Sequence, residues 1–189
     1  MGLTEWAYTL SEAMLSEPLP RRWAHSLGVA KRARSLSPIL GADAELLEAA
    51  AVLHDVGYSP TIATTGFHPL DGARFLRGQG GADERVVSLV AHHSCALLEA
   101  EERGLRQELE GEFELERPDL VDALLYCDMT TTPDGTQTTP TERLDEIVHR
   151  YGPDTIVGRF IQRAAPEIHA ASKRVGDRMA DASVGGQPM

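Results

Sequence analysis

Cysteine and long apolar runs are both scarce in this 189-residue chain. Its two cysteines, Cys95 and Cys127, lack the CxxC spacing of a zinc ribbon and are too few for a disulfide framework. No apolar run approaches the ~20 residues that cross a bilayer. Met1–Ser16 also lacks the basic start and unbroken apolar centre of a signal peptide. We therefore expect a cytoplasmic protein, with no membrane partner, whose cysteines are small buried side chains.

Positive charge is in short supply as well. Lys and Arg total 18 against 29 Asp and Glu, so the formal net charge is -11. A long nucleic acid is not expected as the main partner, because such binding needs clustered Lys and Arg. A small phosphorylated substrate remains compatible with this charge, since a bound metal can reverse the local field.

Alternating strand patterns are also rare, and helical periodicity dominates the chain. The hydrophobic fraction of 42% and charged fraction of 25% are typical of a soluble globular domain. With no internal repeat and no evident second domain, we expect a single all-α domain over about residues 1–180. The tail from Asp181 to Met189 is expected to be disordered.

Apolar spacing and capping residues predict where the helices lie. The acidic segment Glu99–Glu116 is expected at the surface and partly helical. The expected helices cover Thr4–Ser16, Arg21–Ser37, 41–57 with Asp43 as N-cap and Gly57 at the C-terminal end, a helix with His68 at its cap and Pro69 at its first position, 83–102 as one helix or two joined near Ser94, 117–129, one opened by the Thr139–Glu142 capping box, and Asp154–Met179.

His54 and Asp55 are an unusual pair at the end of an apolar helix. They continue the face of Leu47 and Ala51, so both side chains should point towards the core. Two polar groups there are costly unless something compensates them, and the helix dipole disfavours a negative charge in the last turn. A cation beside the pair would remove both penalties.

Other inward-facing side chains supply partners for such a cation. His25 and Asp128 each continue the apolar stripe of a helix. With His54 and Asp55 they form a set of nitrogen and oxygen ligands from three helices, which suits iron, manganese, cobalt or zinc. A second ion could use further histidines, with Asp55 bridging the two ions; the candidates are His68, His92 and His93.

This ordered pattern resembles the HD-domain superfamily of metal-dependent phosphohydrolases, and so do the segments WAHSLGVAKRA, AAAVLHDVGYSP and FHPLDGARFL. The resemblance covers about Arg21–Thr131. It implies a helical bundle in which His25, His54, Asp55 and Asp128 hold a first metal, with His54 and Asp55 catalytic. His68 and one or both of His92 and His93 match the extra histidines of the two-metal branch. The metals implied are iron or manganese, with cobalt, nickel, zinc or magnesium as alternatives.

The implied activity is hydrolysis of a phosphate ester or anhydride of a nucleotide or related small molecule. Symmetrically cleaving dinucleoside tetraphosphate hydrolases look the most similar, and their His followed by Ser or Thr favours His93 over His92. Those hydrolases usually carry a Lys where this chain has Tyr58 and Ser59. The cyclic-di-nucleotide phosphodiesterase branch is set aside because HHE and GYP motifs do not occur, so the substrate stays open.

Three arginines are candidates for holding a substrate phosphate, with an ordinary surface role as the alternative favoured for each: Arg22, Arg74 and Arg77. No Ser–His–Asp or Cys–His arrangement suggests covalent catalysis. One alternative keeps the fold but changes the chemistry, since a minority of HD-like proteins are mixed-valent di-iron oxygenases with the same ligand pattern. Another is a non-catalytic nucleotide-binding module, which ranks last because no first-site ligand is missing.

Overall fold

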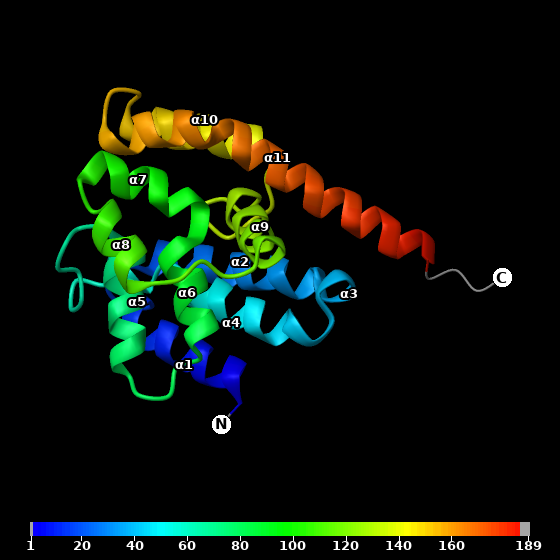
Figure 1. Ribbon diagram of the computed structural model, residues 1–189, viewed down its shortest axis with the longest axis horizontal. Helices are drawn as coiled ribbons and strands as arrows, with labels where there is room; N and C mark the ends of the chain where they lie inside the picture. Colours follow the sequence, from blue (N-terminus) through cyan, green and yellow to red (C-terminus); the bar gives the residue numbers. More distant parts are fainter. Residues whose placement is uncertain (1, 186–189) are drawn as a thin grey trace.

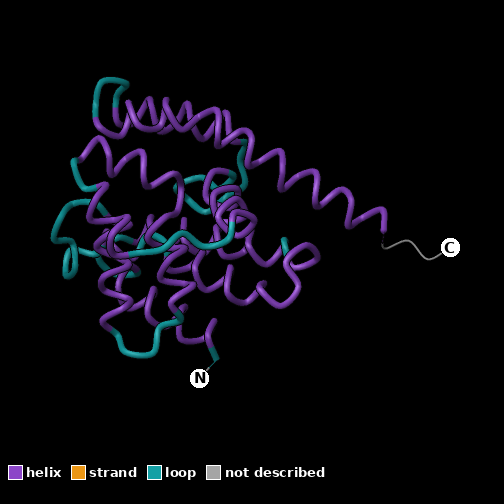
Figure 2. The backbone as a smooth tube through the Cα atoms, viewed as in Figure 1, coloured by secondary structure: helices purple, strands orange, loops and turns teal. Residues whose placement is uncertain are grey.

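The computed structural model describes residues 2–185, and helices account for nearly all of its regular structure (Figures 1 and 2). In that range the one extended pairing is an isolated antiparallel bridge between Thr131 and Gln137. This confirms the all-α expectation. The helices are α1 (Leu3–Leu15), α2 (Pro20–Ser35), α3 (Ser37–Leu40), η1 (Gly41–Asp43), α4 (Ala44–Leu53), η2 (Val56–Tyr58), α5 (His68–Gly78), α6 (Glu84–His92), η3 (His93–Cys95), α7 (Ala96–Arg103), α8 (Arg106–Glu112), α9 (Pro118–Met129), α10 (Pro140–Tyr151) and α11 (Ile156–Gly185).

The main hydrophobic core surrounds α4. Apart from Glu45 and Glu48 near its start, this helix is apolar, and it packs against α1, α2, α6 and α9. A helix with so small a polar face belongs largely in the interior. Its alanines, Ala49 to Ala51, are fully buried, and their small side chains let neighbouring helices come close. The His54-Asp55 pair follows directly on α4, so it enters the protein's interior with the helix.

A second apolar cluster joins α10 and α11 to this core. Leu144 and Ile147 of α10 meet Phe160 and Ile161 of α11, while α9 contributes Leu125 from its outer face. In Figure 1 α10 and α11 lie along the top of the molecule, and the last turns of α11 extend beyond the bundle. Helix α9 belongs to both clusters, so residues at its C-terminal end lie where the two layers meet.

Several helix boundaries differ from the sequence expectation. Pro38 lies in the first turn of α3, where its missing N–H costs nothing, and does not simply terminate the preceding helix. Gly57 belongs to the separate turn η2, because α4 ends at Leu53. His68 is the first residue of α5 and Phe67 is its N-cap. The region 83–102 is two helices, α6 and α7, joined by the short turn η3.

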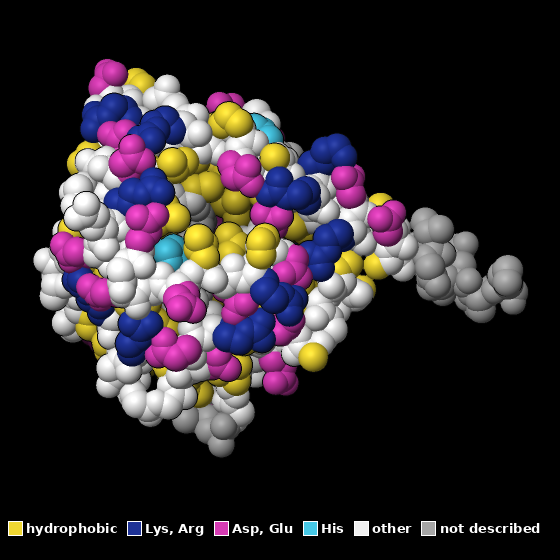
Figure 3. Space-filling model, in the orientation of Figure 1, with side chains coloured by type: hydrophobic (Ala, Val, Ile, Leu, Met, Phe, Trp, Pro, Cys, Tyr) yellow, Lys and Arg dark blue, Asp and Glu magenta, His cyan; other side chains and the backbone are white. Residues whose placement is uncertain are grey.

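The chain's end and its acidic segment were also only partly foreseen. Residues 181–185 continue α11, contrary to the expected disordered tail, and residues 186–189 lie outside the described range. The segment 99–116 is largely at the surface, but Glu99 is buried and pairs with Arg103. No described helix is both long and apolar enough to cross a membrane. Acidic and basic side chains are interspersed over the face shown in Figure 3.

One buried carboxylate organises the loop that leads into α5. Asp71 is 2% exposed. It accepts hydrogen bonds from the backbone N–H groups of Thr64, Thr65 and Gly66 and from both threonine hydroxyls, at 2.8 to 3.2 Å. Because His68 follows this loop immediately, Asp71 also fixes where that imidazole begins.

We expect Asp71→Ala to lower the free energy of unfolding by about 2 kcal/mol or more, because buried backbone donors lose their acceptor. Urea denaturation followed by circular dichroism measures this. Asp83→Ala is the matched control, since Asp83 accepts a hydrogen bond from the Arg85 N–H at the exposed N-terminus of α6. We expect the control to cost about 1 kcal/mol or less. Equal losses in the two variants would contradict the role given to Asp71.

Candidate metal centre

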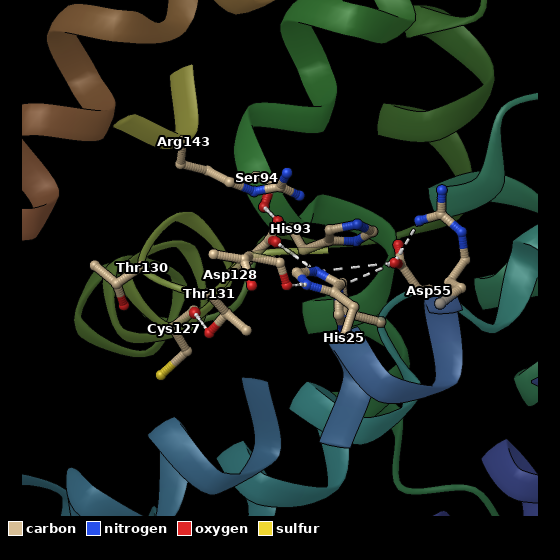
Figure 4. Close-up of polar contacts among 12 residues, drawn as sticks. His25, Asp55, His93, Ser94, Cys127, Asp128, Thr130, Thr131 and Arg143 are labelled. Carbon is tan, nitrogen blue, oxygen red and sulfur yellow. Dashed lines mark hydrogen bonds and ion pairs between the residues drawn. The ribbon is translucent and has the colours of Figure 1, made fainter. Parts of the chain in front are cut away.

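Five buried side chains from four parts of the bundle converge beneath the α10–α11 layer. His25 comes from α2, His54 and Asp55 follow α4, His93 opens η3, and Asp128 comes from α9. Each is at most 8% exposed. Figure 4 shows His25, Asp55, His93 and Asp128 directed towards a common centre. Two groups of three have ligand atoms within 4.8 Å of one another: His25, His54 and Asp128, and His54, Asp55 and His93.

The three histidines of this centre are oriented by the same device. The Nδ1 atoms of His25, His54 and His93 lie 2.9, 2.7 and 2.7 Å from the backbone carbonyl oxygens of Thr132, Ala51 and Val90. A carbonyl only accepts, so each Nδ1 carries the proton and donates it. Each Nε2 is then left with a free lone pair facing the centre, which is how metal-binding histidines are prepared.

A close backbone approach sets the carbonyl that orients His25. The turn containing Thr132 packs against α2 at Gly28, where a Cβ atom would lie 2.5 Å from the Gly135 carbonyl oxygen. Gly135 itself has a φ of +79°, which favours glycine. Gly28 is therefore a site of close approach, and the approaching group is the backbone of this turn.

With their Nδ1 atoms protonated, the histidines of this centre bring unprotonated Nε2 atoms close to other acceptors, and a cation between them would make these contacts favourable. His25 Nε2 lies 2.9 Å from Asp128 Oδ1, and His93 Nε2 lies 3.0 Å from His68 Nε2. With Nδ1 protonated, the first contact places two acceptors face to face. His54 Nε2 is buried with no hydrogen-bond partner at all. A divalent ion accepts lone pairs from imidazole and carboxylate alike, so this donor set fits a metal.

Asp55 presents its two oxygens to different histidines. Oδ2 lies 3.5 Å from His54 Nε2 and 4.0 Å from His25 Nε2, whereas Oδ1 lies 3.4 Å from His68 Nε2. Oδ2 also accepts a hydrogen bond from Arg22 at 2.5 Å. One carboxylate thus faces both halves of the histidine cluster.

The protonation states suit a metal centre near neutral pH. Burial raises the pKa of Asp55, but the positive charge of the Arg22 guanidinium opposes this effect, and the pKa of Asp55 is held well below its usual value. Burial and the proximity of His93 lower the pKa of His68 despite the opposing charge of Asp55. Ionised carboxylates and neutral imidazoles are the forms that bind metal.

An aromatic stack borders the same centre. The Arg22 guanidinium lies 3.4 Å above the centre of the Tyr58 ring, and Tyr58 stacks on His68 with the ring centres 3.9 Å apart. The Arg22 guanidinium is therefore held from two sides, by the Asp55 carboxylate and by the Tyr58 ring. Tyr58 thereby supports the position of His68.

The structure does not bring every sequence candidate to this centre. His92 Nε2 donates to the Phe113 carbonyl at 2.8 Å, so His93 is the histidine of that pair that reaches it. Arg74 pairs with Glu108 and Glu112 at the surface. Arg77 pairs with Glu84. Of the three candidate arginines, Arg22 alone lines the cavity above the cluster.

Two features of the site were missed from the sequence. Ser94 donates its hydroxyl to Asp128 Oδ2, and both Ser94 and Cys95 have left-handed backbones with φ of 51° and 62°. Such a conformation is costly for residues other than glycine and often marks a functional turn. The expected helix break near Ser94 was the only signal. Arg143 and Arg150 of α10 also line the cavity, from a segment beyond the range of the resemblance.

The cavity has a polar side and a mixed side. It holds about 650 Å³ of empty space, including the part open to solvent. The His/Asp cluster, Ser94 and Arg22 form one side. The side formed by α10 and α11 is mixed, with Ile147, Tyr151 and Phe160 beside the basic Arg143 and Arg150. An arrangement of this kind can place one charged group at the cluster and further charged or less polar groups against the second layer.

Parts of this chain are similar to known proteins. Ribonuclease Y of Rubrobacter xylanophilus is 41% identical over 70 residues, which are 37% of this chain and 14% of that protein. A deoxyguanosinetriphosphate triphosphohydrolase-like protein of Nitrobacter hamburgensis is 41% identical over 76 residues, 38% of this chain and 18% of that protein. The matches thus span less than a fifth of these curated relatives' lengths. No solved structure was found to match.

The HD domain family matches residues 22–149. This range contains all the converging histidines and aspartates from His25 to Asp128, and it extends through most of α10. HD domains bind divalent metals, in agreement with the His/Asp groups of this centre. The match covers well over half of the chain, and the protein therefore belongs to the HD domain family.

Proposed function

We propose that this protein is a metal-dependent phosphohydrolase that cleaves a phosphate ester or anhydride of a nucleotide or related small molecule. The observation that carries the proposal is the convergence of unshared imidazole and carboxylate lone pairs at the floor of an open cavity. The names of the relatives, ribonuclease Y and deoxyguanosinetriphosphate triphosphohydrolase-like protein, support chemistry on phosphorylated compounds.

The donor set is large enough for two ions, and Asp55 lies between its two groups of histidines. His25, His54, Asp128 and Oδ2 of Asp55 would hold the first ion. His68, His93 and Oδ1 of Asp55 would contribute to a second. Iron or manganese suits this mixture of nitrogen and oxygen ligands best. When bound, such ions supply Lewis acidity, which activates a water and neutralises developing charge on the phosphoryl oxygens.

The remaining groups hold and shield the reacting centre. Arg22 holds Asp55 in place through its hydrogen bond, and its position in the cavity wall lets it meet a phosphoryl oxygen. Ser94 fixes the second oxygen of Asp128. Burial raises the pKa of Cys95 to about 12, so that thiol stays protonated near neutral pH and is a poor nucleophile. Attack by water, without a covalent enzyme intermediate, therefore suits the site.

The decisive experiment is metal analysis of protein purified without oxygen, followed by hydrolysis assays on the same sample. The panel contains nucleoside mono-, di- and triphosphates, dinucleoside tetraphosphates, sugar phosphates and a short oligoribonucleotide. We expect one or two metal ions per chain and phosphate or pyrophosphate release from at least one compound, detected by chromatography. The result that would contradict the proposal is a metal-loaded protein that leaves the whole panel intact.

Two outcomes of that experiment would favour the alternative functions. Oxygen-dependent turnover by the iron-loaded protein, without hydrolysis, would assign the site to a di-iron oxygenase. Tight nucleotide binding without turnover in the metal-loaded protein would assign it to a non-catalytic binding module.

A further inference from the structure

The part of the cavity wall that α10 forms contains two arginines that share one carboxylate. On α10, Glu146 accepts hydrogen bonds from Arg143 Nη1 at 2.5 Å and from Arg150 Nε at 2.7 Å. Among residues 2–185, no carboxylate other than Glu146 forms an ion pair with Arg143 or Arg150. Two positive charges against one negative charge leave a surplus of one at this place, in a chain whose net charge is -11.

Arg143 is buried and has donors to spare. It is 9% exposed, and its Nε–H is buried with no hydrogen-bond partner. A guanidinium has five N–H donors in a planar fork, and leaving a buried one unsatisfied is costly. Figure 4 shows the side chain extending from α10 towards Ser94 and Asp128. The unused donors therefore lie beside the metal centre rather than out in solvent.

The same arginines border a second hollow. A neighbouring cavity of about 680 Å³ is lined by Pro18, Pro20 and Arg21, and it shares Arg22, His25, Arg143 and Arg150 with the cavity above the metal centre. Arg143 and Arg150 thus lie between the two spaces, next to the place where a cleaved phosphate would be held. A further anionic group of the same substrate would meet them there.

We propose that Arg143 and Arg150 of α10 bind a second phosphate group of the substrate, so that the preferred substrates carry two or more linked phosphates. The fork of Arg143 matches the tetrahedral oxygens of a phosphate and can donate two parallel hydrogen bonds. The inference rests on the proposed function in one respect: it takes the His/Asp cluster as the position of the cleaved phosphate.

The test compares two inorganic probes that differ only in the number of linked phosphates. Calorimetry with the metal-loaded protein measures the affinity for inorganic phosphate and for tripolyphosphate. In the wild type we expect tripolyphosphate to bind at least about tenfold more tightly, since added charge-assisted hydrogen bonds contribute that much. In Arg143→Gln we expect that preference to fall about tenfold, with the phosphate affinity and the metal content unchanged within twofold.

Two further variants control for folding and for general charge. Arg150→Gln removes a less buried partner of the same site, with 31% of its side chain exposed, and should reduce the preference in the same direction. Arg77→Gln removes a surface charge that lines neither cavity and should leave both affinities unchanged. A structural effect of Arg143 on the metal centre would instead weaken both probes equally.

The outcomes separate this inference from the proposed function. If the wild type hydrolyses nothing but its tripolyphosphate preference depends on Arg143, the second phosphate site stands and the proposed activity fails. If the wild type is a hydrolase and neither Arg143→Gln nor Arg150→Gln changes the preference, the second phosphate site is wrong. An equal loss of affinity for phosphate and for tripolyphosphate in Arg143→Gln, with unchanged metal content, would also overturn the second phosphate site.

Discussion

Asp55→Ala is expected to leave the protein without bound metal and without hydrolytic activity. Asp55 is the one residue of the centre whose two oxygens face different histidines, Oδ2 towards His25 and His54 and Oδ1 towards His68. Removing it takes an anionic ligand from both halves at once. We expect metal content to fall to background in elemental analysis. Activity should fall by about a thousandfold or more, since several kcal/mol of charge stabilisation depend on the metal.

The exposed Asp134 provides a matched control for this substitution. Arg22 and Arg21 are neighbours on α2, and each pairs with an aspartate, Asp55 in the interior and Asp134 at the surface. Asp134→Ala removes the exposed pair, which water screens and which contributes little to stability. It should bind metal as the wild type does. Circular dichroism of Asp55→Ala tests whether the helical fold persists without the carboxylate, and we expect that it does.

An intact metal content in a folded Asp55→Ala protein would refute the assignment of the centre. A loss of metal in Asp134→Ala of the same size would mean that ion pairs of α2, rather than ligation, control binding. Asp55→Asn adds a finer comparison, because it keeps the shape and one oxygen but removes the charge. We expect Asp55→Asn to bind metal more weakly than the wild type by a factor of about a hundred.

The positions of His25, His54, Asp55 and Asp128 could be predicted because each follows an apolar stripe. Burial of the stripe decides where such a side chain points, and that information is local. The choice between His92 and His93 was harder, since Leu89, Val90 and Ala91 of α6 are all buried. A helix buried on most sides gives little information about orientation. The break after His92, where Ser94 and Cys95 turn left-handed, directs His93 to the centre.

The roles of the arginines could not be predicted in this way. Arg74 and Arg77 on α5 and Arg143 on α10 all lie on amphipathic helices. The spacing of apolar residues around them does not show which of the three reaches the cavity. What separates them is tertiary: glutamates of α8 cover Arg74, whereas α10 packs over the metal centre through Leu144 and Ile147. Amphipathic spacing shows which face of α10 is apolar, but the helix that meets this face is not encoded in the spacing.

Gly57 shows a similar limit of interpretation from sequence. A glycine near a helix end usually indicates a C-cap with a left-handed backbone. Here Gly57 lies in η2, where it touches α5. A Cβ atom at this position would lie 2.0 Å from the His68 carbonyl oxygen and 2.6 Å from the Gly72 backbone nitrogen. The glycine is required by a neighbour in space, which the local pattern does not reveal.

Gly57→Ala is accordingly expected to destabilise the protein by about 3 kcal/mol or more, because the new methyl group meets backbone atoms that cannot rotate away. Relief requires η2 and the start of α5 to separate, and that movement carries His68 away from Asp55 and His93. Urea denaturation measures the loss of stability. Metal analysis of the folded fraction should show weaker binding on the His68 side of the centre.

Gly78→Ala at the other end of α5 isolates this contact from the general effect of the substitution. No atom lies within 4 Å of a Cβ built on Gly78, and its backbone is not left-handed. Alanine there removes flexibility from the unfolded chain and should be neutral or stabilising by up to about 1 kcal/mol. If Gly57→Ala were as stable as Gly78→Ala and bound metal normally, then η2 and α5 would tolerate separation. The position of His68 would then depend on Asp71 and its loop rather than on the contact at Gly57.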